Sequence, residues 1–309
     1  VDGQPLAART PHVVTHAPTT PLALQLSLDG YQPHAATIDL MSPALTSPLD
    51  VELQRAPRWR HEALGPLLEA PWVDSSGIVV GGADRTVHLL AWDGQERWRL
   101  PLALFAATGG TPLAIGDLVV VVEATQGGGR AVAVAARTGE PRWSYDLVGE
   151  GARAVDALDG GALVSAGDQL VLLDAEQGTA RWTLELPEPL AAPAVVAGDR
   201  VFAATVDGHV LVVGKAGTLD GRLKVGGRPC AAPAPTQAGC VVATEAGDIA
   251  VVWRDTAWTR RLPAPLTAAP VVADGVVYAP AGQRLVALDL RDGSPRWERD
   301  LSAPLTSPA

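Results

Sequence analysis

The stretch Leu285-Val-Ala-Leu-Asp-Leu-Arg-Asp-Gly-Ser-Pro-Arg-Trp297 carries the pattern that decides the fold of this chain. Its first half, Leu285–Leu290, is apolar and fits a strand buried between sheets. Asp292-Gly293 is typical of a tight hairpin turn, because glycine readily takes the positive φ that such turns need. Pro295-Arg296-Trp297 then opens a second strand, so the stretch predicts a β-hairpin whose return strand carries tryptophan.

This hairpin pattern recurs along most of the chain at a nearly constant interval. We name the six repeated indoles the register tryptophans: Trp59, Trp98, Trp143, Trp182, Trp258 and Trp297. The wide gap between Trp182 and Trp258 is halved by Gly221, which we interpret as a position that has lost its indole, since Gly217-Thr-Leu-Asp-Gly221 aligns with Gly178-Thr-Ala-Arg-Trp182. A proline follows each of the seven positions at a similar spacing, except after Trp143; these prolines are Pro71, Pro112, Pro193, Pro233, Pro270 and Pro308.

A repeat of about 40 residues, with four short strands and little helical periodicity, is typical of a β-propeller made of four-stranded blades. One repeat shows strand-like segments at 192–199, 200–205, 209–213 and 222–225, bounded by glycine and aspartate. Each blade must bury its face on a neighbour, so the blades stack. We predict an all-β fold with six complete blades, at 66–103, 104–148, 149–187, 188–226, 227–263 and 264–301, and a partial seventh.

Two further segments lie where the repeat spacing predicts a strand, but neither is part of a complete repeat. Arg58–Leu64, which contains Trp59, is predicted to be a lone outermost strand, and Ser302–Ala309 has the phase of an innermost strand. Innermost and outermost strands cannot pair without the two strands between them. We therefore expect a natural ring of at least seven blades, a propeller truncated at its end, and an incomplete blade or a gap beside the first blade.

Three of the repeats, Val132–Trp143, Leu170–Trp182 and Val286–Trp297, resemble the tryptophan-docking repeats of the quinoprotein-like (PQQ-like) propeller family. The resemblance covers about residues 56–309. In that family the tryptophan lies between adjacent blades, over the small residue that opens the motif. The resemblance therefore implies a structural blade-seam position for the register tryptophans. A buried indole contributes about 200 Å² of contact, on the order of several kcal/mol.

The segment 1–55 does not carry the repeat. Pro21–Leu28 alternates apolar and polar residues, a turn at Asp29-Gly30 follows, and Leu49–Leu53 has the pattern of a closing strand. Val1-Asp-Gly3, Thr10-Pro11 and Gly30-Tyr31 resemble a PEGA domain whose first strand is cut away. We assign residues 1–55 to this small β domain, truncated at its start, and residues 56–309 to the propeller.

Composition excludes several classes of protein. With 309 residues, 47% hydrophobic residues and 2 cysteines, the chain can bury a large core without a disulfide framework. The net charge of -10 argues against a nucleic-acid partner, which favours a basic surface. No apolar run approaches the ~20 residues of a membrane span, and no signal peptide is evident. Because the sequence begins at Val1, we interpret it as a piece of a parent protein, which can itself be membrane-anchored.

Histidines and cysteines do not form a recognisable site. His88 and His209 open the third strand of blades one and four, and we interpret them as surface-edge residues rather than metal ligands, because no His or Cys lies near either at metal spacing. Cys230 and Cys240 should lie ~20 Å apart on an extended hairpin, so we predict two separate thiols. The quinoprotein dehydrogenases carry an adjacent cysteine pair beside the cofactor, and this sequence has none.

Catalytic motifs are also missing from the sequence. It has no Gly-x-Ser-x-Gly elbow and no Gly-x-x-x-x-Gly-Lys loop, and we interpret Gly127–Arg130 as a flexible loop that accounts for the longer step between Trp98 and Trp143. Asp174 and Asp289 recur at one repeat position, which indicates turn residues rather than a carboxylate pair. We predict no catalytic residue, no metal ligand and no cofactor.

The sequence favours a non-catalytic module that binds protein partners of unidentified nature or acts as a sensor. The resemblance implies an extracytoplasmic location in the bacterial cell envelope, as in the propeller lipoprotein of outer-membrane assembly or the sensor part of a receptor-like Ser/Thr kinase. Two alternatives stay open at this stage. One is a quinone-dependent dehydrogenase, which would need a calcium site, and the other is a sensor that binds a small ligand in the propeller channel.

Overall fold

The computed structural model describes residues 21–39, 42, 51–63, 65–67, 70–74, 77–82, 84–102, 107–253, 257–266 and 268–305. The chain divides into two compact units, Val1–Glu62 and Ala63–Ala309. All regular structure in the described residues is β. A search of these residues found no helix that is both long and apolar enough to cross a membrane.

The N-terminal unit contains one antiparallel hairpin. Strand β1 (Leu22–Leu26) pairs with β2 (His34–Ile38), and Leu22 lies opposite Ile38. Alternate side chains of β1 are more buried, as the alternating sequence predicts. Tyr31 forms an isolated bridge with Arg55. Residues 51–53 of the predicted closing strand are not in a strand, and 49–50 lie outside the described residues.

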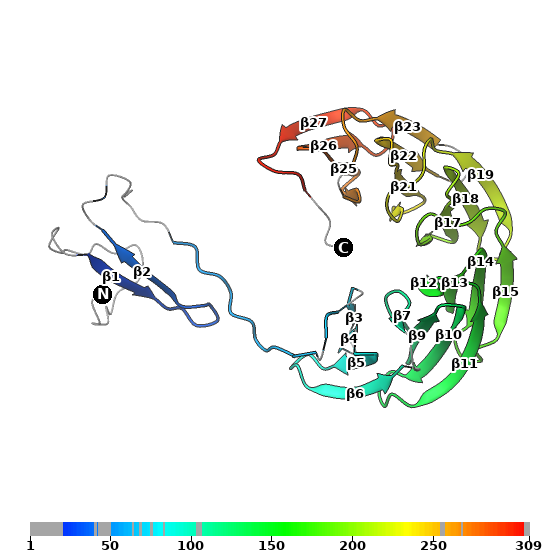
Figure 1. The fold of residues 1–309 in the computed structure, drawn as a ribbon, viewed down its shortest axis with the longest axis horizontal. Helices are drawn as coiled ribbons and strands as arrows, with labels where there is room; N and C mark the ends of the chain where they lie inside the picture. The colour runs from blue at the N-terminus through cyan, green and yellow to red at the C-terminus, as the bar shows by residue number, and fades with distance from the viewer. Residues whose placement is uncertain are drawn as a thin grey trace. The chain divides into compact units, whose positions relative to one another are not determined.

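The C-terminal unit contains the six predicted sheets, each an antiparallel blade with its strands in sequence order. Figure 1 shows the blades succeeding one another around an arc. Blade 1 is β3 (Trp72–Asp74), β4 (Gly77–Gly81), β5 (Thr86–Leu90) and β6 (Glu96–Pro101). Blade 2 is β7 (Ala107–Thr108), β8 (Leu113–Ile115), β9 (Leu118–Thr125), β10 (Gly128–Ala135) and β11 (Pro141–Val148), where β7 and β8 both pair with β9.

The remaining four blades have four strands each. Blade 3 is β12 (Arg153–Leu158), β13 (Gly161–Ala166), β14 (Gln169–Asp174) and β15 (Ala180–Glu185), and blade 4 is β16 (Val195–Ala197), β17 (Arg200–Ala204), β18 (His209–Gly214) and β19 (Leu219–Lys224). Blade 5 is β20 (Ala234–Pro235), β21 (Cys240–Ala243), β22 (Asp248–Val252) and β23 (Ala257–Arg261), and blade 6 is β24 (Val271–Ala273), β25 (Val276–Ala281), β26 (Arg284–Asp289) and β27 (Pro295–Asp300).

The core of the propeller consists of seams between successive blades. Buried valine, leucine and alanine side chains of one sheet pack against those of the next, in five clusters that join blades 1–2, 2–3, 3–4, 4–5 and 5–6. The middle strands are buried on both faces, which explains their continuous apolar sequences. Blades 1 and 6 stand at the two ends of the arc in Figure 1 and are not adjacent. The described residues thus form six blades with five seams.

The repeat phase predicted two leftover strands, and this prediction is wrong. Residues 58–63 and 302–305 have no strand structure, and Leu64 and residues 306–309 lie outside the described residues. The physical reason is that each strand needs a hydrogen-bonding neighbour, and the two middle strands of a seventh blade do not occur in the described part of the chain.

The interpretation of Gly127–Arg130 as a flexible loop is also wrong. Gly128 begins β10, which pairs with β9 and β11. The longer repeat arises because these three strands have eight residues each. Glycine is required here because the strands approach closely: a Cβ on Gly129 would lie 2.5 Å from the carbonyl oxygen of Glu123.

The seam between blades 4 and 5 provides a test of this core. Phe202 on β17 is fully buried there, whereas Leu219 on β19 of the same blade is 43% exposed. We expect Phe202→Ala to lower the free energy of unfolding by about 3–5 kcal/mol, because it leaves a cavity in a closed seam. Leu219→Ala is the matched control and should cost much less. Urea unfolding would measure both, and equal losses would contradict this description of the core.

Candidate functional site

Four register tryptophans cross a seam and donate a hydrogen bond to the next blade. The indole Nε1–H groups of Trp98, Trp143, Trp182 and Trp258 donate to the carbonyl oxygens of Ala136, Ala175, Lys215 and Leu290, at 2.8, 2.7, 2.9 and 3.1 Å. Each acceptor lies in the turn that joins the third and fourth strands of the following blade. The polar end of the indole is therefore satisfied, while its ring covers apolar surface at the edge of the seam.

A glycine in the same turn makes room for the indole. Gly178 has φ +70°, and a Cβ built on it would lie 2.5 Å from the ring of Trp143. The same close approach relates Trp98, Trp182 and Trp258 to Gly139, Gly217 and Gly293. The indole thus lies over the turn glycine of the next blade.

Aspartate and arginine of the repeat hold this turn in shape. Asp174 accepts hydrogen bonds from the backbone N–H groups of Glu176 and Gln177, at 3.0 and 2.9 Å, and pairs with Arg181 at 2.8 Å. The N–H of Gln177 and then the guanidinium of Arg181 hold the pKa of Asp174 below its ordinary value of 3.8. Asp289 and Arg296 repeat the pair at 2.7 Å. The turn role predicted for both aspartates is confirmed.

The seam between blades 4 and 5 lacks a register tryptophan, and both of its blades differ from those at the other seams. Gly221 is in register with Val212 and Phe202 on the face of blade 4 that packs on blade 5. The sequence between β22 and β23 of blade 5, residues 253–256, contains no glycine. The pairing of β22 with β23 also lacks the register shift seen in the other five blades. The indole and the glycine that would receive it are therefore missing from the same seam.

The two remaining register tryptophans differ from these four. Trp59 belongs to the N-terminal unit, is partly buried and lies outside any strand. Trp297 on β27 is 44% exposed, and its ring lies 5.9 Å from that of Tyr278. The structure thus brings four of the six predicted seam residues into blade-to-blade contacts.

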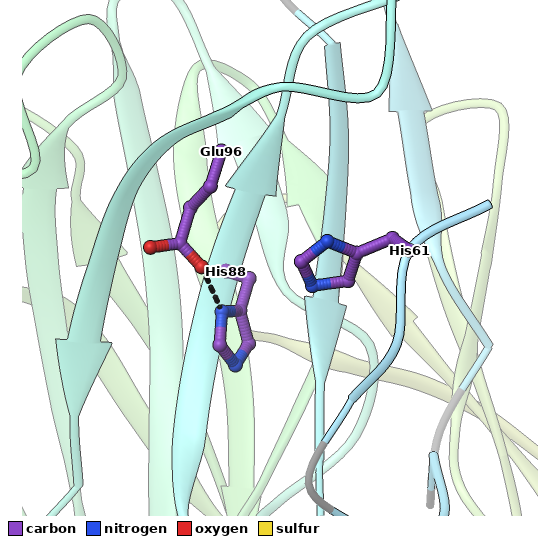
Figure 2. Close-up of side chains that lie close together, drawn as sticks. All are labelled: His61, His88 and Glu96. Carbon is purple, nitrogen blue, oxygen red and sulfur yellow. Dashed lines mark hydrogen bonds and ion pairs between the residues drawn. The ribbon is translucent and has the colours of Figure 1, made fainter. Parts of the chain in front are cut away.

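His88 is buried in a polar network, so its interpretation as a surface-edge residue is wrong. It is 6% exposed, and its Nδ1 lies 2.7 Å from a carboxylate oxygen of Glu96 (Figure 2). Its Nε2 lies 3.4 Å from Asp84. The cause is that β5 is a middle strand, with β4 and β6 on either side. The third side chain labelled in Figure 2, His61, belongs to the N-terminal unit.

Blades 4 and 5 contain similar polar networks, which our sequence interpretation missed. Glu188, only 7% exposed, accepts from the hydroxyl of Thr205 at 2.7 Å and pairs with Arg222 and His209. In blade 5, Asp248 pairs with Arg261, and its backbone N–H donates to the hydroxyl of Thr244. A repeated Thr-x-x-Gly, at Thr205–Gly208 and Thr244–Gly247, is the sequence signal that could have revealed them.

The two cysteines are separate thiols, as predicted. Cys240 is fully buried in the seam between blades 4 and 5, whereas Cys230 is exposed. Burial raises the pKa of both thiols, most strongly that of Cys240, because a thiolate there would be removed from water. Neither thiol is therefore activated as a nucleophile.

Among the described residues, two hollows of the surface lie beside blades 5 and 6. Each is open to solvent, with a volume of about 450 Å³, and Pro263 and Arg284 line both. Arg284 is itself paired with Asp300 at 2.9 Å. These hollows are shallow surface features, and Arg284 is already neutralised by its partner.

These observations define the class of protein: a quinoprotein-like β-propeller whose blades are joined by tryptophan docking. The family model described as outer membrane protein assembly factor BamB matches residues 53–159 and 127–308. The chain belongs to this family. A search of curated proteins found no match.

Solved structures share the fold at low sequence identity. BamB from Moraxella catarrhalis has 19% identity and a TM-score of 0.64, and the match covers 81% of this chain and 79% of that one. Quinohemoprotein alcohol dehydrogenase from Comamonas testosteroni has 13% identity and a TM-score of 0.59, with 76% and 59% covered. The computationally designed Ika8 protein has 14% identity and a TM-score of 0.53, with 79% and 90% covered. One fold thus serves unrelated purposes.

The docked indoles lead to a stability prediction. Trp182→Ala should lower the free energy of unfolding by about 3 kcal/mol, the lower end of the range for a large aromatic, because its ring is only partly buried. Trp297→Ala is the matched control, since this ring does not cross a seam within the described residues. Thermal and urea unfolding would measure both variants. A Trp182→Ala protein as stable as the Trp297→Ala protein would contradict a stabilising role for the dock.

The turn aspartates lead to a prediction of pH dependence. The pKa of Asp174 is lower in the folded chain than in the unfolded chain, so its carboxylate stabilises the fold above about pH 3.8 and this contribution is lost as the pH falls through the folded pKa. Asp174→Asn should therefore lower the melting temperature at neutral pH and approach the parent protein at acid pH. Asp207→Asn controls for the loss of one exposed charge. A pH-independent difference would count against the mechanism.

Proposed function

We propose that this protein is a non-catalytic scaffold that binds other proteins through the rims of its propeller. The observation that carries the proposal is that the buried polar side chains of the propeller are bound to partners inside their own blades. The carboxylates of Glu188 and Asp248 and the imidazole of His88 are each tied to partners within their own blade. Groups held in this way close turns and fix the rims rigidly. Rigid rims that present exposed turns suit protein recognition, because little order must be gained on binding.

Membership of the BamB family supports this function, since the name of that family describes assembly of outer membrane proteins. We also propose an extracytoplasmic location in the cell envelope. The PEGA-like pattern of residues 1–55, together with the propeller, is consistent with the sensor part of a receptor-like bacterial Ser/Thr kinase. This finer proposal rests on the sequence resemblance alone.

The likeness to a quinohemoprotein alcohol dehydrogenase makes a quinone-dependent enzyme the second candidate. The residues present do not fit that cofactor. The family's adjacent cysteine pair is missing, because Cys230 and Cys240 are free and the latter is fully buried in a seam. A sensor that binds a small ligand is not favoured by the two hollows, which are shallow and open.

A ligand titration distinguishes a scaffold from a dehydrogenase. Pyrroloquinoline quinone added together with calcium should leave the melting temperature and the quinone absorption spectrum unchanged. A ligand that binds only the native state must raise the melting temperature by mass action. Saturable stabilisation at micromolar quinone would overturn the non-catalytic proposal.

Photo-crosslinking in cells tests protein binding directly. A photoreactive residue would replace either Asp207, in the turn between the second and third strands of blade 4, or Glu176, in the turn between the third and fourth strands of blade 3. These exposed turns lie at opposite ends of the strands, so they report on the two rims separately. We expect one rim to give a discrete protein adduct in the envelope fraction. Labelling at neither rim would contradict the proposal.

A further inference from the structure

Four seams receive an apolar or aromatic side chain from the outermost strand, two residues after the register position. Each of these side chains is partly buried and packs against the cluster that its blade shares with the next one. They are Leu100, Tyr145, Leu184 and Leu223. The seam between blades 5 and 6 has Arg260 at this position, two residues after Trp258. A charged side chain thus lies where the other four seams of the described residues have an apolar or aromatic one.

The guanidinium of Arg260 crosses the seam and has no carboxylate partner. Its Nη1 donates to the carbonyl oxygen of Gly293, in the turn of blade 6, at 2.9 Å. Within the described part of the chain this is its one hydrogen bond, and no ion pair involves it. The side chain is exposed. Because a guanidinium carries five N–H donors, most of them stay available to a further acceptor.

An open hollow of about 450 Å³ lies beside Arg260. Its charged lining residues are Arg260, Arg261, Arg284 and Glu298. Val286 and Leu288 also line it, but they are 1% and 0% exposed. The surface that a ligand can reach therefore belongs to the side chains around them, and it is rich in arginine.

Two of the three arginines are neutralised within the protein. Arg261 pairs with Asp248, and Arg284 pairs with Glu298 and Asp300 at 3.5 and 2.9 Å. Arg260 is the arginine of this hollow whose charge no acidic group of the described residues offsets. The net charge of -10 repels an acidic partner from the molecule as a whole, so such a partner needs a local positive group. A carboxylate complements the hollow at this point.

The open shape of the hollow favours a carboxylate carried by a protein over a free anion. One exposed guanidinium holds a small anion weakly, whereas surrounding contacts that exclude water strengthen the same pair inside an interface. A second hollow of about 460 Å³ adjoins the first, because Pro263 and Arg284 line both. It extends to Gln283, in the turn between the second and third strands of blade 6. A partner can therefore contact the rim and the arginine together.

We propose that the hollow around Arg260 is a docking site for an acidic side chain of a partner protein, with Arg260 as the residue that selects it. This inference rests on the scaffold function proposed above and names the chemistry of one contact. A leucine at this position would pack on the seam, as Leu184 does between blades 3 and 4. The arginine gives up that packing, and a docked carboxylate offsets its charge.

Selection of displayed peptides tests the site with a defined probe. A phage library of random dodecapeptides is selected on the whole chain, and the selected peptides are then measured on Arg260→Gln and Arg299→Gln. Arg299 is the matched control, because it is an exposed arginine that lines neither hollow. We expect the peptides to share an Asp or Glu, and to bind Arg260→Gln at least tenfold more weakly than the parent and Arg299→Gln. Changing that Glu of the peptide to Gln should weaken binding to the parent and not to Arg260→Gln.

The variant Arg260→Leu separates recognition from stability. It restores an aliphatic side chain of the kind found at the other seams, so its melting temperature should equal or exceed that of the parent. The acidic peptides should nevertheless bind it at least tenfold more weakly. Full binding by either Arg260 variant would overturn the proposal.

The remaining outcomes assign the surface differently. Peptides that lack a shared acidic residue would overturn the site and leave the scaffold function standing. Absence of cross-links at both Asp207 and Glu176 would instead remove the scaffold function itself, so the two failures are distinguishable. Inorganic phosphate that displaces the peptides at the same concentration would assign the hollow to a free anion and also overturn the proposal.

Discussion

The contact on which the propeller depends is the indole that crosses four of the five seams in the described residues onto a glycine turn. A seam made of valine, leucine and alanine alone would be apolar but would not fix the alignment of the two blades, because such surfaces can slide past one another. The hydrogen bond from indole Nε1 to a turn carbonyl, such as that from Trp143 to Ala175, fixes the register of one blade on the next. The Asp174–Arg181 pair then holds the turn on the same blade that sends Trp182 onward, so blade 3 both receives and supplies a dock.

Stability in such an array is a sum of blade and seam contributions between neighbours. The face of blade 6 that does not pack on blade 5 shows how strongly the fold depends on the neighbour, since Val271 and Trp297 on it are 61% and 44% exposed. The seam between blades 4 and 5 shows the opposite case. There Phe202 fills the interior although Gly221 has replaced the indole, so a large buried side chain can replace the dock.

The periodic features of the fold could be predicted from the sequence, because the glycine turns and the tryptophan spacing encode local hairpins in most of the repeats. The environment of an individual side chain could not be predicted in the same way. His88 is buried because its strand lies in the middle of a blade, and Gly128 lies in a strand because its partners are long. The Glu188 network joins Arg222 to a residue far from it in the chain, and its partners become visible only when the blade is assembled. The lone strands expected at 58–64 and 302–309 show the same limit, since strand structure needs a partner as well as a phase.

Hydrogen–deuterium exchange resolved strand by strand tests the central claim, that seams carry the stability of the propeller, most directly. Amides of β13, β14, β17 and β18 lie in blades covered on both faces, whereas those of β25 and β26 lie in a blade covered on one face. Local opening should follow the number of seams, because a blade that loses fewer contacts opens at lower free energy. We predict slow, correlated exchange in blades 3 and 4 and markedly faster exchange in blade 6. Uniform protection across all six blades would contradict the account.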